Sequence, residues 1–129
     1  MKYSKRGAPL TRCSETLTDS AFFSKIRSHA RKLSMFWKPK TDFLLELREP
    51  NLEEIGGKRV KFVYPCIACG QRFPLKGVQV DHIVPCGSVL TFEDIGSFYE
   101  RLLVEKHGYQ ILCKLCHQTK TNEERRGRK

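Results

Sequence analysis

The sequence lacks any long hydrophobic run, because its apolar stretches are only a few residues long. A helix needs about 20 consecutive apolar residues to span a bilayer, so we expect no membrane span. The polar and basic start, residues 1–6, leads into no apolar segment, so we expect no secretion signal and a cytoplasmic protein. We find no internal repeat. A chain of 129 residues suffices for one domain with a modest core, or for a small domain with an extension.

Acidic residues are scarce beside basic ones, and the imbalance is uneven along the chain. Lys and Arg total 24 against 14 Asp and Glu, which gives a net charge of +10. Residues 1–41 hold ten of these bases and two acids, whereas residues 42–129 hold fourteen and twelve. Four of the five residues from Arg125 to Lys129 are basic. Clustered positive charge favours a polyanionic partner, nucleic acid first, although a solvated basic surface is the alternative.

The basic first third contains one predicted helix. After an arm over residues 1–14, which we expect to be extended or disordered, helical periodicity covers residues 20–38. Asp19 or Ser20 is the expected cap, and Pro39 ends the segment. The apolar face of the helix comprises Phe23, Ile26, Ala30, Leu33 and Trp37.

Basic side chains flank that apolar face. With two bases near the C-terminus they are the candidate DNA contacts: Lys25, Arg27, Arg31, Lys32, Lys38, Arg125 and Arg126. An amphipathic helix with a solvated basic surface has the same pattern, and so does a helix that lies on a membrane surface.

The rest of the chain alternates short strands with helices. Expected strands cover residues 58–64, 78–84 and 109–112, and expected helices cover residues 42–48, 91–106 and 113–124. In the first strand, Val60, Phe62 and Tyr64 are expected to share one face. Thr91 is the expected cap of the helix at 91–106, and Gly108 is its expected stop.

Four of the six cysteines form two pairs with metal-ligand spacing. They are Cys66, Cys69, Cys113 and Cys116, in the arrangement Cys-x2-Cys-x43-Cys-x2-Cys. Two residues between thiolates allow each turn to present both sulfurs to one tetrahedral ion, which favours a structural Zn²⁺ site. Unrelated turns with free thiols, a redox pair and an iron–sulfur cluster are the alternatives. Cys13 and Cys86 fall outside the pattern and are expected to be free thiols.

An acid and an imidazole, Asp81 and His82, lie side by side between the two cysteine pairs. On a strand their side chains point to opposite faces, so one can bind a metal while the other faces a substrate. His117 directly follows the last cysteine. A zinc ion that joins the two pairs would bring His117 close to the strand with Asp81. A carboxylate and an imidazole could then hold one divalent ion with open coordination positions, as a catalytic metal requires.

Two stretches together resemble the HNH nucleases that carry flanking zinc knuckles. They are Asp81-His82-Ile83-Val84-Pro85 and Leu112-Cys113-Lys114-Leu115-Cys116-His117-Gln118-Thr119-Lys120-Thr121. The resemblance extends from about Cys66 to Thr121 and leaves out the N-terminal half. It implies an α+β fold with a ββα-metal core, in which two short strands and a helix surround one divalent ion.

The resemblance also implies a division of roles. Asp81 and His117 would bind the catalytic metal, which would be Mg²⁺ or Mn²⁺, with Ni²⁺ or Zn²⁺ as alternatives. His82 would be the general base that takes a proton from a water aimed at the scissile phosphorus. The expected substrate is double-stranded DNA, cut to 5′-phosphate and 3′-hydroxyl ends.

One position departs from the family pattern. The family usually has Asn where this chain has Gly108, and that Asn braces the loop and helps to orient the base. Gln110 matches the pattern and is expected to brace the loop, and the adjacent His107 is an alternative. Asn122 is a further, weaker candidate for the metal site. Lys120 lies on the face of His117 and either reaches a phosphate or completes the helix surface.

These observations predict a metal-dependent HNH endonuclease of the phage or homing type. Residues 1–57 would form a basic, helical, DNA-contacting extension, and residues 58–129 the nuclease domain with its zinc knuckles. A phage-encoded protein would act in the host cytoplasm. The alternatives are a zinc-stabilised DNA-binding module with an inactive site, and a nuclease directed at RNA.

Overall fold

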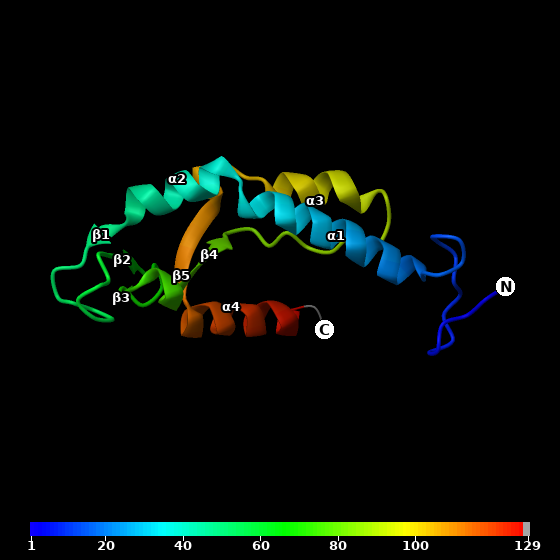
Figure 1. Cartoon of the computed structure of the whole chain (residues 1–129), viewed down its shortest axis with the longest axis horizontal. Coiled ribbons are helices and arrows are strands. Elements are labelled where there is room, and N and C mark those ends of the chain that lie inside the picture. The colour runs from blue at the N-terminus through cyan, green and yellow to red at the C-terminus, as the bar shows by residue number, and fades with distance from the viewer. Residues whose placement is uncertain (128–129) are drawn as a thin grey trace. The chain divides into compact units, whose positions relative to one another are not determined.

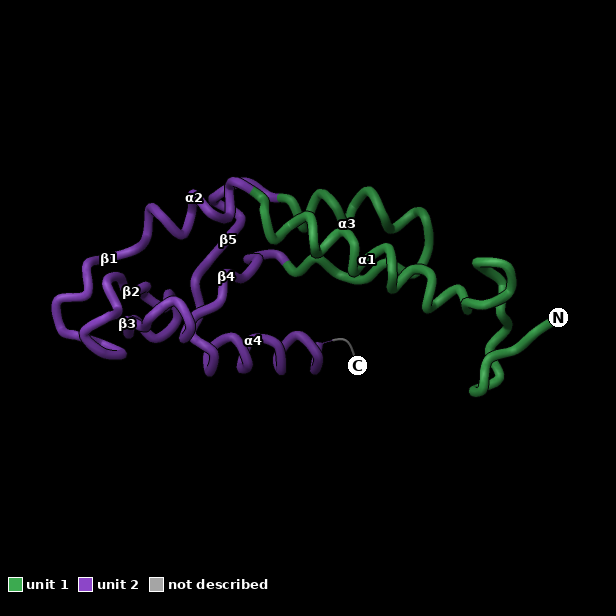
Figure 2. The backbone as a smooth tube through the Cα atoms, viewed as in Figure 1, with its two compact units in different colours: residues 1–37, 85–103 green, residues 38–84, 104–129 purple. Residues whose placement is uncertain are grey.

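The structure, a computed structural model, describes residues 1–127 and divides the chain into two compact units, each built from two separate segments (Figure 2). Residues 1–37 and 85–103 form the first unit. Residues 38–84 and the chain from Val104 onward form the second. Helices and small sheets are both present, so the mixed α and β character is confirmed. Arg128 and Lys129, part of the basic C-terminal run, lie outside the described residues.

Within residues 1–127, every helix is too short or too polar to cross a membrane. The functional boundary expected between residues 57 and 58 stays a prediction.

Two helices make the core of the first unit, α1 (Asp19–Met35) and α3 (Asp94–Leu102) (Figure 1). Phe98 and Leu102 of α3 are each 1% exposed. The buried residues that pack together are Phe23, Ala30, Cys86, Val89, Phe98 and Leu102. Of the apolar stripe predicted for the first helix, Phe23, Ile26 and Ala30 therefore pack in this cluster. Leu33 is 53% exposed.

The N-terminal arm is more ordered than expected. Arg12 and Leu17 form an isolated β-bridge, and the Arg12 guanidinium lies 4.8 Å from the centre of the Phe22 ring. Arg12 Nε also pairs with the Asp19 carboxylate at 3.1 Å. A cation over an aromatic ring and an ion pair thus tie the arm to the start of α1.

The helices expected over residues 20–38 and 42–48 are both present, but the first ends earlier and the second begins earlier than predicted. Thr18, rather than Asp19 or Ser20, caps α1, because its hydroxyl accepts a hydrogen bond from the Ala21 N–H at 3.1 Å. The helix ends at Met35, and α2 (Lys38–Leu47) begins three residues later with Pro39 in its first turn. The expectation that Pro39 ends a helix was wrong, because proline has no N–H to lose in a first turn.

The helix expected over residues 91–106 is shorter than predicted. It begins at Asp94, whose carboxylate accepts hydrogen bonds from the backbone N–H groups of Leu90 and Thr91. These two bonds hold the pKa of Asp94 below its ordinary value. The helix ends at Leu102, so Gly108 does not stop it and instead closes a 3-10 turn, η2 (Lys106–Gly108).

The second unit contains the two sheets. A three-stranded antiparallel sheet has the order β1-β2-β3, and a two-stranded sheet pairs β4 with β5. The elements in chain order are α2, β1 (Glu49–Pro50), β2 (Phe62–Pro65), β3 (Arg72–Phe73), η1 (Leu75–Gly77), β4 (Val78–His82), η2, β5 (Tyr109–Cys113) and α4 (Lys114–Gly127). The strands expected near 78–84 and 109–112 and the final helix are confirmed to within a few residues.

The strand expected over residues 58–64 is reduced to β2, and its buried face differs from the prediction. Val63 and Tyr64 are buried, whereas Phe62 is 38% exposed and lies under the Arg48 guanidinium at 4.1 Å. Consecutive buried residues break the expected alternation, because Tyr64 packs into the cluster with Val78 while Val63 faces the loop after β1.

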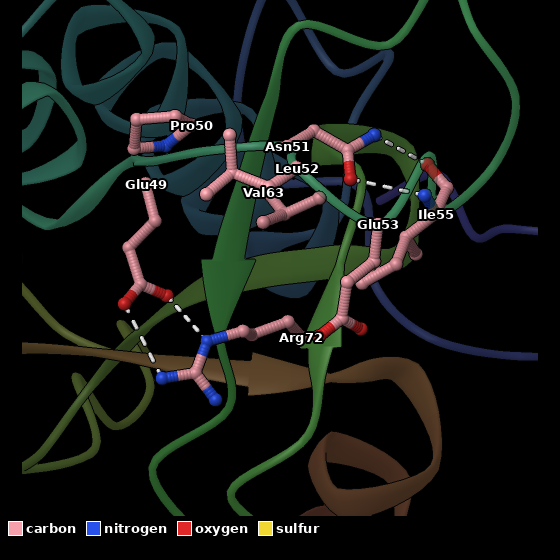
Figure 3. Close-up of a pocket in the computed structure, with 8 residues that line it drawn as sticks. All are labelled: Glu49, Pro50, Asn51, Leu52, Glu53, Ile55, Val63 and Arg72. Atoms are coloured by element: carbon pink, nitrogen blue, oxygen red, sulfur yellow. Dashed lines mark hydrogen bonds and ion pairs between the residues drawn. The ribbon is translucent and has the colours of Figure 1, made fainter.

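A shallow pocket of about 290 Å³ lies beside the loop after β1 (Figure 3). Arg72 makes two bonds to the Glu49 carboxylate across it, at 2.6 and 3.2 Å. The Asn51 amide closes the loop by bonding both the N–H and the carbonyl of Ile55 at 2.9 Å. Side-chain bonds of this kind fix a loop that contains little regular structure.

Candidate functional site

The four predicted metal ligands come together in the second unit. Cys66 follows β2, Cys113 is the last residue of β5 and Cys116 lies in the first turn of α4. With Cys69 as the fourth member, the four ligand sulfurs all lie within 4.8 Å of one another. A hydrogen bond from the Ile67 N–H to the Ile111 carbonyl, 2.9 Å long, joins the first pair to β5. Two turns from distant parts of the chain thus converge on one point.

The backbone of the first pair is built for this convergence. The Gly70 N–H bonds the Cys66 carbonyl at 2.8 Å, and the Cys66 N–H bonds the Gln71 carbonyl at 2.9 Å. Gly70 has a φ of +75°, which a glycine adopts without the strain of a side chain. The knuckle turn predicted at Cys69-Gly70 is confirmed.

The pKa values of the clustered thiols differ from one another. Burial raises the pKa of Cys66, but hydrogen bonds from the backbone of Cys113, Cys69 and Ala68 lower it to about 6. A hydrogen bond with the Cys113 side chain, together with burial, raises the pKa of Cys116 to about 12. One negative charge in the cluster therefore opposes the next. Four thiolates this close need a cation, and a tetrahedral Zn²⁺ is an ion that the cluster could hold.

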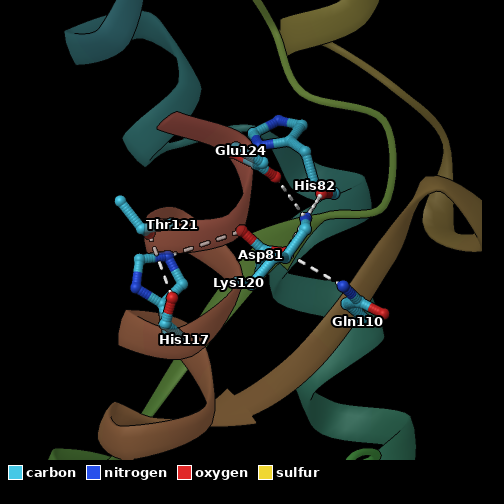
Figure 4. A network of polar contacts seen from close by, with 7 residues as sticks. All are labelled: Asp81, His82, Gln110, His117, Lys120, Thr121 and Glu124. Carbon is cyan, nitrogen blue, oxygen red and sulfur yellow. Dashed lines mark hydrogen bonds and ion pairs between the residues drawn. The ribbon is translucent and has the colours of Figure 1, made fainter. Parts of the chain in front are cut away.

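The second site is the carboxylate of Asp81, in β4. Asp81 Oδ1 lies 3.5 Å from Nε2 of His117, which projects from the first turn of α4 (Figure 4). Asp81 Oδ2 accepts a hydrogen bond from Gln110 Nε2 at 2.9 Å and another from the Lys120 ammonium. The Asp81 side chain is only 14% exposed. One carboxylate oxygen is thus held by donors, while the other faces an imidazole nitrogen that could share a divalent ion with it.

Strand pairing explains why these side chains meet. In the antiparallel pair of β4 with β5, Asp81 stands opposite Gln110 and His82 opposite Tyr109. Neighbours on paired strands have Cβ atoms about 4.5–5.5 Å apart, so Gln110 reaches Asp81 directly. The Tyr109 ring packs against the His82 imidazole with ring centres 5.1 Å apart. Figure 4 shows the imidazoles of His82 and His117 pointing in different directions.

Lys120 connects the two neighbouring site residues. Besides its bond to Asp81, the Lys120 ammonium donates to the backbone carbonyl of His82 at 2.7 Å. It also lies 3.4 Å from the Glu124 carboxylate, one turn further along α4. Glu124 is not among the residues predicted for the site, although its spacing from Lys120 was a usable signal. Asn122 Oδ1 accepts a hydrogen bond from Gln118 Nε2 at 2.9 Å, within α4 itself.

Gly108 lies where the family pattern has Asn, and its surroundings leave no room for a side chain. A Cβ added to Gly108 would lie 2.6 Å from Val104 Cγ2 and 2.7 Å from Val104 Cβ. The Gly108 carbonyl accepts a hydrogen bond from the Ile83 N–H at 3.0 Å, which extends the β4–β5 ladder by one bond. His107, the alternative brace, is exposed.

The structure places the predicted DNA contacts on three helices. Those on α1 are exposed in the first unit: Lys25, Arg27, Arg31 and Lys32. Lys38 begins α2 and pairs with Asp42 at 2.5 Å. Arg125 and Arg126 are exposed in the last turn of α4.

A comparison with curated proteins supports the resemblance to HNH nucleases. A protein of Lactococcus phage SK1 named "Probable HNH endonuclease" is 38% identical over 63 residues. The match covers 49% of this chain and 60% of the phage protein, so it spans less than two thirds of that relative. No family model matches the chain, and no solved structure matches it.

The cysteine cluster predicts zinc in the isolated protein. Protein purified without added metal should contain about one zinc per chain, as a closed four-thiolate site does. Replacing Cys66 and Cys113 by serine should abolish both the zinc and the fold, since a structural zinc contributes on the order of 10 kcal/mol. Elemental analysis and circular dichroism are the measurements. Cys13→Ser, outside the cluster, is the control, and a folded protein without metal would refute the site.

The surroundings of Gly108 and Gly96 predict that alanine at the two positions changes the free energy of unfolding in opposite directions. Gly108→Ala should lower the free energy of unfolding by about 1–3 kcal/mol, because the methyl group overpacks against Val104. Gly96, within α3, has open space around its Cβ position. Gly96→Ala should therefore raise the free energy of unfolding by about 0.5–1 kcal/mol, as in other helices. Urea unfolding measures both, and an unchanged Gly108→Ala variant would contradict the packing.

Proposed function

We propose that the chain is a metal-dependent HNH endonuclease that hydrolyses phosphodiester bonds in DNA. The observation that carries this proposal is the pairing of Asp81 Oδ1 with His117 Nε2 at 3.5 Å, beside His82. The strands β4 and β5 pair antiparallel, with α3 and η2 between them in the chain, and α4 directly follows β5. We interpret β4, β5 and α4 as the ββα-metal core, and the similarity to the phage protein supports this interpretation.

The residues at this site fit a divalent metal ion. A carboxylate oxygen and an imidazole nitrogen form a donor set suited to Mn²⁺, Mg²⁺, Ni²⁺ or Zn²⁺. Because Asp81 and His117 supply only two ligands, positions remain for water and a phosphate oxygen. When bound there, the ion would supply charge stabilisation at the phosphate. The four-cysteine cluster would hold a second ion, a purely structural Zn²⁺.

His82 is the proposed general base. Its imidazole takes a proton from the attacking water, because histidine is the side chain most often used as a general base near neutral pH. Tyr109 packs against the imidazole and limits its rotation. The water oxygen bonds to the phosphorus as the bond to the 3′-oxygen breaks. The 3′-oxygen keeps the electron pair and takes a proton from solvent, which leaves 5′-phosphate and 3′-hydroxyl ends.

Double-stranded DNA is the proposed substrate, because +10 of net charge favours a polyanion. The exposed bases of α1 and the end of α4 would contact its phosphates. Residues 1–57 would then serve as a DNA-contacting extension of a nuclease domain at residues 58–129. A phage origin, with action in the host cytoplasm, is part of this proposal.

A zinc-stabilised DNA-binding module with an inactive site is the second candidate. It is favoured by one observation, the glycine at position 108 where the family carries Asn. Both candidates bind DNA and zinc, so only cleavage distinguishes them.

The nuclease proposal predicts a metal-dependent cut that requires His82. Wild-type protein should cleave supercoiled plasmid in Mg²⁺ or Mn²⁺. His82→Ala should cleave it about 100- to 10,000-fold more slowly, the usual loss for a general base. The assay should include single-stranded DNA and RNA, with EDTA as the metal-free control.

The matched control is His29→Ala, an exposed histidine of α1 in the other unit, which should cleave like wild type. If wild type and His82→Ala are both inert yet bind DNA equally, the binding module is the correct candidate. Cleavage of RNA but not of DNA would show that the enzyme is a ribonuclease.

A further inference from the structure

One peptide unit of the site, between His82 and Ile83, is held from two sides. Its carbonyl oxygen accepts a hydrogen bond from the Lys120 ammonium at 2.7 Å. Its N–H donates to the Gly108 carbonyl at 3.0 Å. This peptide directly follows the Cα atom that carries the His82 side chain. Fixing its plane therefore fixes the direction in which the imidazole leaves the strand.

The same ammonium selects which oxygen of Asp81 is available. Lys120 and Gln110 both donate to Oδ2, and only Oδ1 faces His117. Lys120 is 24% exposed and Asp81 14%, so this ion pair is partly shielded from water. Shielding strengthens such a bond relative to one at the surface. A rotation of the carboxylate would break both donor bonds.

The brace expected from residue 108 cannot come from a side chain. Val104 occupies the space that a Cβ at Gly108 would need, 2.6 Å away. Gly108 contributes only its carbonyl, to the N–H side of the peptide. The carbonyl side of the peptide is bonded from a different element, by Lys120 of α4.

From these contacts we propose that Lys120 is a positioning residue, which aims His82 and orients Asp81 in place of the side chain that Gly108 lacks. The proposal rests on the nuclease function proposed above. It differs from a role in DNA binding, in which Lys120 would contact a phosphate. The two roles predict different kinetic changes, because positioning acts on the chemical step and a phosphate contact acts on binding.

Kinetics of Lys120→Met test the positioning role. At saturating Mn²⁺, kcat should fall by about 10- to 100-fold, the usual loss when the partner of a metal ligand is removed. KM and the salt dependence of DNA binding should stay at wild-type values. Lys120→Arg, which retains donors and charge, should recover part of kcat. Lys114→Met, at the exposed first residue of α4, is the control and should leave both constants unchanged.

A phosphate contact gives the opposite result. Then KM would rise with kcat retained, and the slope of log K against log salt would fall by about 1. That outcome would overturn the positioning role, and so would a wild-type kcat in Lys120→Met.

Backbone dynamics test the same role without cleavage. The order parameter of the Ile83 N–H, measured by ¹⁵N relaxation, should fall from about 0.85 toward 0.6 in Lys120→Met and stay high in Lys114→Met. A fall in a chain that never cuts DNA would support the brace and reject the nuclease. An unchanged order parameter would reject the brace even if wild type cleaves DNA.

Discussion

Convergence of the two cysteine pairs is the constraint on which the site depends. The first pair follows β2, and the second joins the end of β5 to the start of α4. With Cys113 and Cys116 fixed, the first turn of α4 has one direction, and His117 is the next residue along it. The β4–β5 register then carries Asp81 to the same place, since Val78 pairs with Cys113 at the cluster end of the ladder. An ion bound by the four cysteines would thus fix the positions of Asp81 and His117 without contacting either residue.

Asp81 and His82, the proposed metal ligand and general base, point to opposite faces of β4 and contact different side chains. Asp81 is surrounded by Gln110, Lys120 and His117, whereas His82 packs on Tyr109. Lys120 bonds the side chain of the first and the backbone of the second. A metal ligand and a general base need different surroundings, and adjacent positions on one strand provide them because successive side chains point to opposite faces.

The spacing of residues along the sequence predicted part of this site. The features that it did not predict depend on contacts between residues far apart in the sequence. The cysteine spacing and the position of His117 were enough to predict that Asp81 and His117 meet. Lys120 was left between two roles, because helical spacing says which face a residue occupies and not what lies opposite. The reason for Gly108 is its contact with Val104, which no local rule predicts. The division into two units of interleaved segments also depends on contacts between distant parts of the chain.

The central claim is that Asp81 and His117 bind one divalent ion apart from the cysteine cluster. Anomalous diffraction from crystals of the zinc-loaded protein soaked in Mn²⁺ tests it most directly. We expect a manganese peak bonded to Asp81 Oδ1 and His117 Nε2, absent in Asp81→Ala, and a zinc peak among the four cysteines in both proteins. Manganese elsewhere, or no manganese beside an intact zinc site, would show that Asp81 and His117 do not share an ion.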